Sequence, residues 1–301
     1  MDFIVTLQNN PLAFYICVGI LGLLIGSFLN VVIYRLPVMM ERDWQEQAQE
    51  LLAEFGKEEA NSERQDPSKS SETDAFNLLV PASTCPKCDH KIKPWENIPV
   101  ISYLFLFGKC SQCKCPISPR YPIIEAVTAI LSVTVAQHFG FGWQTALALL
   151  LTWSLITLTM IDFDHKLLPD TITLPLMWLG LLVNIQGHFV PLEQAVIGAA
   201  AGYLSLWSVF WIFKLATGKD GMGYGDFKLL AAFGAWFGWK TLPIIIVGSS
   251  MVGALVGITL ILVLGRDKNI PIPFGPYLAA AGWIAMLWGD IISSTYFRFA
   301  L

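Results

Sequence analysis

The sequence predicts an all-α, polytopic membrane protein with about eight transmembrane helices and a small cytoplasmic domain between the first and second helices. The 301 residues are 54% hydrophobic and only 14% charged, with a mean hydropathy of +0.57, which is typical of integral membrane proteins. Residues 3–34 carry no charge and residues 121–161 carry only Glu125. Uncharged runs of this length predict helices that cross a bilayer.

Glycine, proline and charged residues divide the apolar sequence into eight predicted spans. The first span follows no basic region and precedes no small-residue cleavage site, so we expect it to be retained rather than removed as a signal peptide. The span at 227–239 is the weakest, because a helix of this length covers about 20 Å of a bilayer core about 30 Å thick. The spans are 12–34, 122–138, 143–161, 172–187, 193–213, 227–239, 241–264 and 273–294.

The distribution of lysine and arginine predicts the orientation. Residues 35–120 hold eleven of the nineteen basic residues, and cytoplasmic loops accumulate such residues. The later ones fall mainly in alternate loops, at Lys166, Lys214, Lys219, Arg266 and Lys268, whereas the opposite loops hold Lys240 and Arg298. We therefore expect residues 35–120 in the cytoplasm and the N-terminus outside. Asp162 and Asp226 then lie at the same, cytoplasmic face.

The sequence divides into three predicted domains. Residues 1–37 form the first transmembrane helix, 38–120 form the cytoplasmic domain, and 121–301 form the main transmembrane domain. The cytoplasmic domain begins with an acidic amphipathic helix that leads into a Ser-, Glu- and Asp-containing linker at 60–75. This segment is either a solvated surface or a docking surface for a partner.

Paired cysteines in the cytoplasmic domain predict a structural zinc site. Cys85 and Cys88 form one C-x2-C pair, and Cys110 and Cys113 form another. Two such turns supply the four thiolates of a tetrahedral site that has no open position for a substrate. Free or redox-active thiols are the alternative. We interpret Cys115 as a bystander, because C-x-C is a poorer chelating turn.

Two acids lie beside apolar spans. Asp162 ends the third span, and Asp226 follows Gly223 and Gly225 at the start of the sixth. A carboxylate at the membrane edge is costly and is therefore a functional candidate, and the glycines would let an extended peptide approach the backbone closely. The alternative is helix capping, which would equally suit Asp226, Asp164 and Asp170.

Two facing carboxylates would support aspartic peptidase chemistry. Both cannot ionise cheaply, so one keeps its proton while the other acts as a base toward water. None of the four histidines lies near a serine or cysteine in a way that suggests a catalytic triad. His165 could tune the acids, and we interpret His90, His138 and His188 as loop or interface residues.

With these motifs, the chain resembles the type IV prepilin peptidases, bifunctional leader peptidases and N-methyltransferases of bacterial pilus and type II secretion systems. The resemblance implies that Asp162 and Asp226 are the catalytic pair. Besides the cysteine pairs, the motifs that carry it are Gly26–Pro37, Trp95–Pro99, Arg120–Glu125, Asp162–Asp170, Gly223–Lys228 and Ile272–Pro276. Cys115 is additional to the four-cysteine pattern of the family, and the acidic residues 41–75 belong to a region that varies among family members.

The resemblance also implies the substrates. Family members cut a basic leader from prepilins and pseudopilins at the cytoplasmic face of the inner membrane, after a glycine, and then methylate the new N-terminus with S-adenosylmethionine. No glycine-rich loop after a strand indicates where that methyl donor binds. The family places this activity in the N-terminal half, so Glu125, Arg120 and residues 95–110 are candidates for its site, with packing as the alternative role.

Two other classes of protein remain as alternatives. Acids in a membrane can carry protons or cations in a transporter or ion pathway, although the spans show no obvious inverted repeat. A zinc-knuckle membrane adaptor would explain the cysteines but would leave the two acids as caps. In every case we expect the lipid bilayer as a partner and no nucleic acid.

Overall fold

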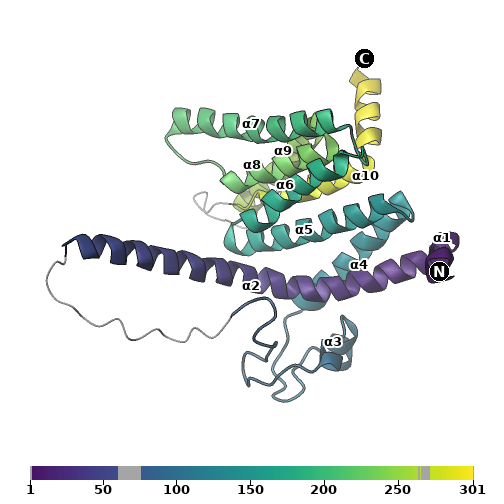
Figure 1. The fold of residues 1–301 in the computed structure, drawn as a ribbon, viewed down its shortest axis with the longest axis vertical. Coiled ribbons are helices and arrows are strands. Elements are labelled where there is room, and N and C mark those ends of the chain that lie inside the picture. Colours follow the sequence, from purple (N-terminus) through teal and green to yellow (C-terminus); the bar gives the residue numbers. More distant parts are fainter. Residues whose placement is uncertain (1, 60–75, 264, 266–271, 301) are drawn as a thin grey trace. The chain divides into compact units, whose positions relative to one another are not determined.

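The computed structural model describes residues 2–59, 76–263, 265 and 272–300. Within these residues the regular elements are helices, which confirms the predicted all-α class (Figure 1). The α-helices are α1 (Asp2–Asn9), α2 (Pro11–Glu59), α3 (Ile101–Phe105), α4 (Arg120–Phe139), α5 (Trp143–His165), α6 (Asp170–Asn184), α7 (Leu192–Thr217), α8 (Tyr224–Phe237), α9 (Leu242–Leu262) and α10 (Gly275–Ala300). Short 3₁₀ turns lie at Pro94–Asn97 and Trp239–Thr241.

Each of the eight predicted spans coincides with one of these helices. Among the residues that the structure describes, five helical stretches are long and apolar enough to cross a membrane: α2, α4, α5, α7 and the stretch Trp239–Leu262 that contains α9. The helices α6 and α8 are shorter, with 15 and 14 residues. The chain is therefore a multi-pass membrane protein, and the count of eight crossings stays a prediction.

The helix α2 is longer than its predicted span. It continues through Pro37 to Glu59, so the membrane span and the predicted amphipathic helix are one helix. Proline removes one backbone donor from a helix interior, but the following residues 41–59 are rich in Glu, Gln, Ala and Leu, which favour helix. The predicted linker at 60–75 lies outside the described residues.

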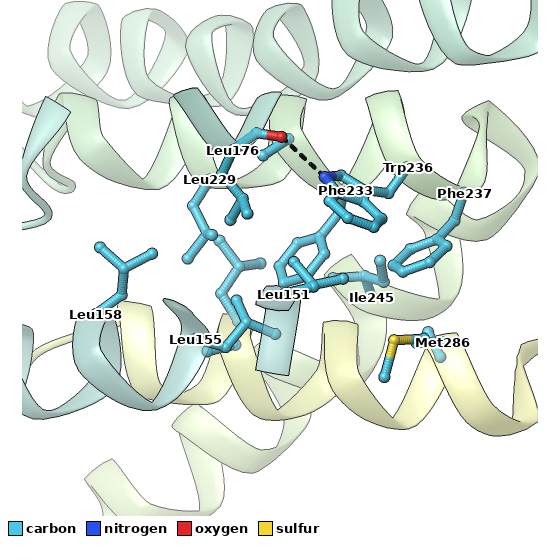
Figure 2. Close-up of a cluster of buried hydrophobic side chains, with 14 of the residues drawn as sticks. Leu151, Leu155, Leu158, Leu176, Leu229, Phe233, Trp236, Phe237, Ile245 and Met286 are labelled. Atoms are coloured by element: carbon cyan, nitrogen blue, oxygen red, sulfur yellow. Dashed lines mark hydrogen bonds between the residues drawn. The ribbon is translucent and has the colours of Figure 1, made fainter. Parts of the chain in front are cut away.

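The chain forms two compact units, 1–22 with 128–301 and 23–127. In the first unit, α8 is the central helix, and eleven of its fourteen residues are buried. It packs against α6, α7, α9 and α10. Figure 2 shows Phe233 and Trp236 of α8 among buried leucines of α5 and α6 and Met286 of α10. Apolar residues on all sides of a helix suit such a buried position.

Polar bonds to α6 hold the C-terminal end of α8. The indole Nε1 of Trp236 donates to the carbonyl of Leu176 at 2.8 Å (Figure 2). Asn184 Nδ2 donates to the carbonyls of Ala235 and Trp236 at 2.9 and 3.0 Å, and Asn184 is 1% exposed. Carbonyls in the last turn of a helix have no partner within that helix. Asn184, at the end of α6, supplies that partner.

Glycines bring α7 and α8 into backbone contact. Gly198 of α7 and Gly234 of α8 lie so close that a Cβ on either would overlap the carbonyl group of the other. One turn further on, a Cβ on Gly202 would lie 2.6 Å from the carbonyl oxygen of Leu230. Small residues of this kind allow close helix packing in membranes.

In the second unit, polar side chains of α2 bind the loop that precedes α4 and the first turn of α4 itself. Arg35, which is 7% exposed, donates to the carbonyls of Asn77 and Pro81 at 2.9 and 2.6 Å. Asn30 Nδ2 donates to the carbonyl of Tyr121 at 3.2 Å, which is the bond between helices that its position in an apolar span suggests. These bonds fix two segments against α2: the loop at Asn77 and Pro81, and the first turn of α4 at Tyr121.

The α7–α8 contact predicts a strong effect of adding one methyl group. Gly202→Ala should lower the free energy of unfolding by about 1–3 kcal/mol, because the new Cβ meets backbone atoms that cannot rotate away. Thermal unfolding of the purified protein in detergent would measure this. The matched control is Gly248→Ala in α9, whose Cβ would lie in ordinary contact 3.6 Å from Ala281. Equal unfolding temperatures for the two variants would contradict the prediction.

Candidate functional site

Asp162 lies in the last turn of α5 and is 6% exposed. Its Oδ2 accepts the backbone N–H of Gly275, the first residue of α10, at 2.9 Å. The first N–H groups of a helix lack partners within that helix and carry partial positive charge. The start of α10 therefore holds the Asp162 carboxylate in place. A Cβ on residue 275 would lie 2.6 Å from that same oxygen, so glycine is the residue that fits.

Asp226 lies in the first turn of α8 and is also 6% exposed. The helix begins after Gly223, and the amide of Asp226 donates to the carbonyl of Gly223 at 3.3 Å. The Asp162 and Asp226 carboxyl groups are close enough to interact electrostatically. The end of α5 and the starts of α8 and α10 thus bring two buried acids together, as the sequence predicts.

Leu168 packs beside both acids. A Cβ on Gly225 would lie 2.6 Å from Leu168 Cβ, and one on Gly275 would lie 3.1 Å from Leu168 Cδ2. Leu168 is 6% exposed and follows the turn at Lys166, whose left-handed backbone ends α5 and donates its N–H to the carbonyl of Asp162 at 2.9 Å. The absence of side chains at both glycines leaves the space that Leu168 fills.

The other acids near Asp162 have different positions. Asp164 and His165 are exposed on the last turn of α5. The capping role considered for Asp170 is wrong, because Pro169 is the N-cap of α6 and no side-chain bond caps the helix. Capping by Asp226 is wrong for the same reason, since Gly223 is the N-cap of α8.

Asp170 instead forms an ion pair with Lys228. The ammonium Nζ of Lys228 lies 2.6 Å from both carboxylate oxygens. The pair joins the first turn of α6 to the N-terminal part of α8, where Lys228 is two residues after Asp226. Neither Gly275 nor Lys228 is predicted as a site residue from the sequence alone, although both belong to motifs that carry the family resemblance.

In the second unit, two loops of the same backbone form present the cysteines. In the first loop, Cys85 N–H donates to the carbonyl of His90 at 2.9 Å, and Asp89 N–H donates to that of Cys85 at 3.0 Å. In the second loop, Cys110 N–H donates to the carbonyl of Cys115 at 2.9 Å, and Lys114 N–H donates to that of Cys110 at 3.2 Å. The residues Asp89 and Lys114 both have positive φ, and bridges Thr84–Lys91 and Lys109–Pro116 close the loops.

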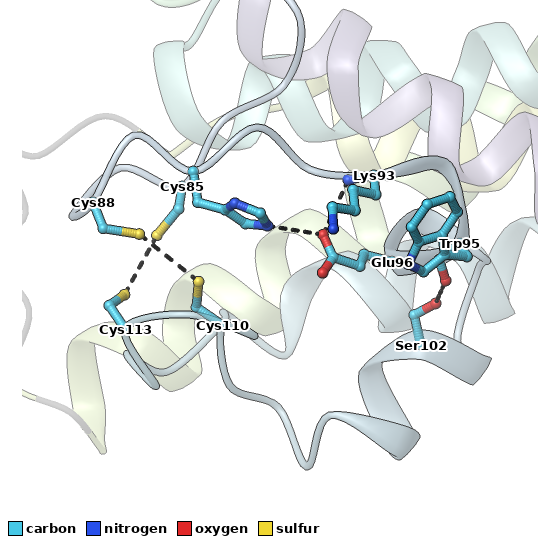
Figure 3. Close-up of polar contacts among 9 residues, drawn as sticks. Cys85, Cys88, Lys93, Trp95, Glu96, Ser102, Cys110 and Cys113 are labelled. Atoms are coloured by element: carbon cyan, nitrogen blue, oxygen red, sulfur yellow. Dashed lines mark hydrogen bonds and ion pairs between the residues drawn. The ribbon is translucent and has the colours of Figure 1, made fainter.

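The equivalent loops bring five thiols together. The Sγ of Cys85 lies 3.8 Å from that of Cys113 and 3.5 Å from that of Cys115. The Sγ of Cys88 lies 4.0 Å from that of Cys110. Figure 3 shows Cys85, Cys88, Cys110 and Cys113 facing one another. Zinc–thiolate bonds of about 2.3 Å in a tetrahedron place the sulfurs about 3.8 Å apart. The cluster therefore fits a tetrahedral metal.

The backbone next to Cys85 favours the thiolate form of this one cysteine. A hydrogen bond from the backbone at Lys87 lowers the pKa of the Cys85 thiol to about 6, and thiolate is the form that binds metal. The four Sγ atoms of Cys85, Cys110, Cys113 and Cys115 lie within 4.8 Å of one another. This group includes Cys115, whereas the group expected from the sequence includes Cys88.

Glu96 connects the first loop to the segment that follows it. Its Oε2 lies 3.1 Å from Nε2 of His90 and accepts the N–H of Lys93 at 3.0 Å (Figure 3). The bond from the Lys93 backbone lowers the pKa of Glu96 to about 2. Further along, the Glu125 carboxylate accepts the N–H of Val100 at 2.7 Å. Glu125 and the segment 95–110 are thus in contact, as a single methyl-donor site formed by both would require.

The comparisons with known proteins agree with this architecture, a multi-pass helical membrane protein with a buried aspartate pair and a thiol cluster. Residues 20–139 match the Bacterial Peptidase A24 N-terminal domain, and residues 149–258 match the Type IV leader peptidase family. The chain belongs to the type IV leader peptidase family. No solved structure matches it.

Curated relatives match over nearly their whole length. A prepilin leader peptidase/N-methyltransferase of Stutzerimonas stutzeri is 57% identical over 98% of this chain and 97% of its own. A protein of the same name from Pseudomonas aeruginosa is 56% identical over the same shares. Another from Legionella pneumophila is 46% identical over 96% of each chain.

The ion pair predicts a small, shared contribution to stability. Lys228→Met should lower the free energy of unfolding by at most about 1 kcal/mol, because the side chains of Lys228 and Asp170 are 25% and 53% exposed and water screens such pairs. Asp170→Asn should have a similar effect, and the double variant should lose no more than either single variant. Thermal unfolding measures all three, and fully additive losses would contradict the pairing.

Proposed function

We propose that this chain is a membrane aspartic endopeptidase that cleaves the basic leader of type IV prepilins and pseudopilins and N-methylates the new N-terminus with S-adenosylmethionine. The main support is that two buried aspartates from separate helix ends, Asp162 and Asp226, lie close enough for their charges to interact. The names of the relatives supply the substrate class and the second activity.

The two carboxyl groups would divide the chemistry between them. Like charges at short range favour a state in which the pair shares one proton. The ionised member takes a proton from water as the water oxygen bonds to the scissile carbonyl carbon, and the protonated member donates to the carbonyl oxygen. When the C–N bond breaks, the protonated member gives its proton to the departing amine, and the ionised member takes a proton from a hydroxyl of the tetrahedral intermediate as the carbonyl re-forms, so the pair again shares one proton. The N–H of Gly275 orients Asp162 throughout.

We place the enzyme in the bacterial inner membrane, with the aspartate pair facing the cytoplasm. Eleven of the nineteen lysines and arginines lie in residues 35–120, and basic residues accumulate on the cytoplasmic side. With the predicted count of crossings, both acids lie on that side too. A prepilin leader held at the cytoplasmic face would then reach them.

The thiol cluster would hold a structural zinc ion through Cys85, Cys88, Cys110 and Cys113. Four thiolates would complete the coordination of the ion, so zinc would stabilise the loops without taking part in the reaction. For the methyl transfer, Glu125, Arg120 and residues 95–110 are the proposed region. The bond between Glu125 and Val100 supports that grouping, and S-adenosylmethionine would supply the methyl group.

The aspartate assignment predicts separate effects on the two activities. Asp162→Asn and Asp226→Asn should each reduce cleavage of a purified prepilin to background, because an amide cannot act as the base or share the proton. Methylation of an already mature pilin should persist, because it does not use these acids. Gel shift and mass spectrometry of the pilin, with and without S-adenosylmethionine, measure both steps.

The matched control is Asp164→Asn, which changes an exposed acid on the same helix turn and should leave cleavage unchanged. Near-normal cleavage by either Asp162→Asn or Asp226→Asn would refute their role. If the unaltered protein cleaves no prepilin, the result would instead favour an ion pathway or an adaptor.

The zinc assignment predicts metal loss when a central thiol is removed. Cys85→Ser should lower the zinc content of the purified protein from about one ion per chain toward zero, because Cys85 contacts sulfurs of the second loop and three thiolates bind zinc less tightly than four. Metal analysis after gel filtration provides the measurement, with Cys17→Ser in α2 as the control. Full zinc retention in Cys85→Ser would contradict the assignment.

A further inference from the structure

The two cysteine loops differ at one equivalent position. Their matching hydrogen bonds pair Cys85 with Cys110 and His90 with Cys115, and the same offset along the chain pairs Cys88 with Cys113. The His90 ring is engaged by Glu96. The Cys115 thiol instead lies 3.5 Å from the sulfur of Cys85. The second loop therefore brings an additional sulfur to the cluster at a position where the first loop has an imidazole directed elsewhere.

The cluster has more thiols than a tetrahedral ion accepts. Zinc in structural sites binds four ligands, and five sulfurs are present. Cys88 is favoured by the C-x2-C turn, and its sulfur lies 4.0 Å from that of Cys110. Cys115 is favoured by proximity, since it belongs to the group of four thiols within 4.8 Å of one another. The Cys88–Cys110 distance of 4.0 Å and the Cys85–Cys115 distance of 3.5 Å are both close to the edge of about 3.8 Å of a zinc–thiolate tetrahedron.

We propose that Cys115 is an alternative metal ligand that exchanges with Cys88 at a single site, while Cys85, Cys110 and Cys113 remain bound. The ion would be a thiophilic divalent cation such as zinc or cadmium. This inference rests on the proposed metal site and is independent of the peptidase assignment.

The exchange is balanced in charge and protons. When the Cys115 thiol binds, it releases its proton and forms a metal–sulfur bond, while the Cys88–metal bond breaks and the departing thiolate takes up a proton. The ion keeps four thiolates in both states. The exchange requires neither oxidant nor reductant. Cys88 and Cys115 are both partly exposed, so water can supply and accept the proton.

The exchange predicts redundancy between two cysteines. In the full-length protein in detergent, Cys88→Ser and Cys115→Ser should each retain about one zinc per chain, and the double variant should lose the ion as Cys85→Ser does. Cobalt substitution provides a second measurement, because the thiolate-to-cobalt absorption of both single variants should match that of four sulfurs. Gel filtration and thermal unfolding would verify that each variant is folded.

Three results would overturn the proposal. Metal loss in Cys88→Ser alone would make Cys88 an obligatory ligand, and loss in Cys115→Ser alone would make Cys115 one. Retention in the double variant would show that neither is a ligand. Retention in Cys85→Ser would instead show that Cys85 is not an obligatory ligand, and absence of zinc from the unaltered protein would refute the metal site itself, so these failures are distinguishable.

Alkylation of the unaltered, zinc-loaded protein tests the exchange without substitution. Iodoacetamide should label Cys88 in some molecules and Cys115 in others, with the other three cluster thiols protected, as peptide mass spectrometry would measure. Labelling confined to Cys115 would make it a bystander, and would also overturn the proposal.

Discussion

The enclosure of α8 is the constraint on which the rest of the membrane unit depends. This short helix is buried on nearly all sides, and its two ends have different partners. At its C-terminal end, Asn184 and Trp236 satisfy polar groups that lipid could not. At its N-terminal end lies Asp226. Because α8 cannot shift without breaking the glycine contact with α7, the position of Asp226 follows from apolar packing more than from polar bonds near the carboxylate.

The glycines of this protein serve two separate purposes. Gly198, Gly202 and Gly234 allow two backbones to touch, which sets the axis of α8. Gly225 and Gly275 make room for Leu168 and for the Asp162 carboxylate. The first group contributes through dispersion contacts between helices. The second contributes by leaving space for groups that a methyl would displace.

The sequence predicted the helices well because hydropathy and charge act locally along the chain. It also predicted that Asp162 and Asp226 adjoin spans whose ends share one face, and it left open whether the two acids touch. It did not predict that Gly275 holds Asp162 or that Asp170 binds Lys228, because such contacts depend on how distant helix ends meet. Continuation of α2 through Pro37 was missed because proline is a local signal of helix ends, which the long helix overrides. The proximity of Cys115 to Cys85 could not be predicted, because it depends on how the two loops fold against each other. The loops have the same backbone bonds, but the residue equivalent to Cys115 in the first loop is His90.

The position of Asp162 near a helix end has a consequence for the depth of the reaction. Asp162 lies three residues before the end of α5 at His165, and a helix rises about 1.5 Å per residue, so the carboxylate-bearing residue is about 5 Å from the end of its helix. With the proposed catalytic role for Asp162, the water molecule that hydrolysis consumes would enter through the interfacial layer. The enzyme would then need no water channel through the hydrocarbon core, and its substrate would present the scissile bond without unwinding inside the bilayer.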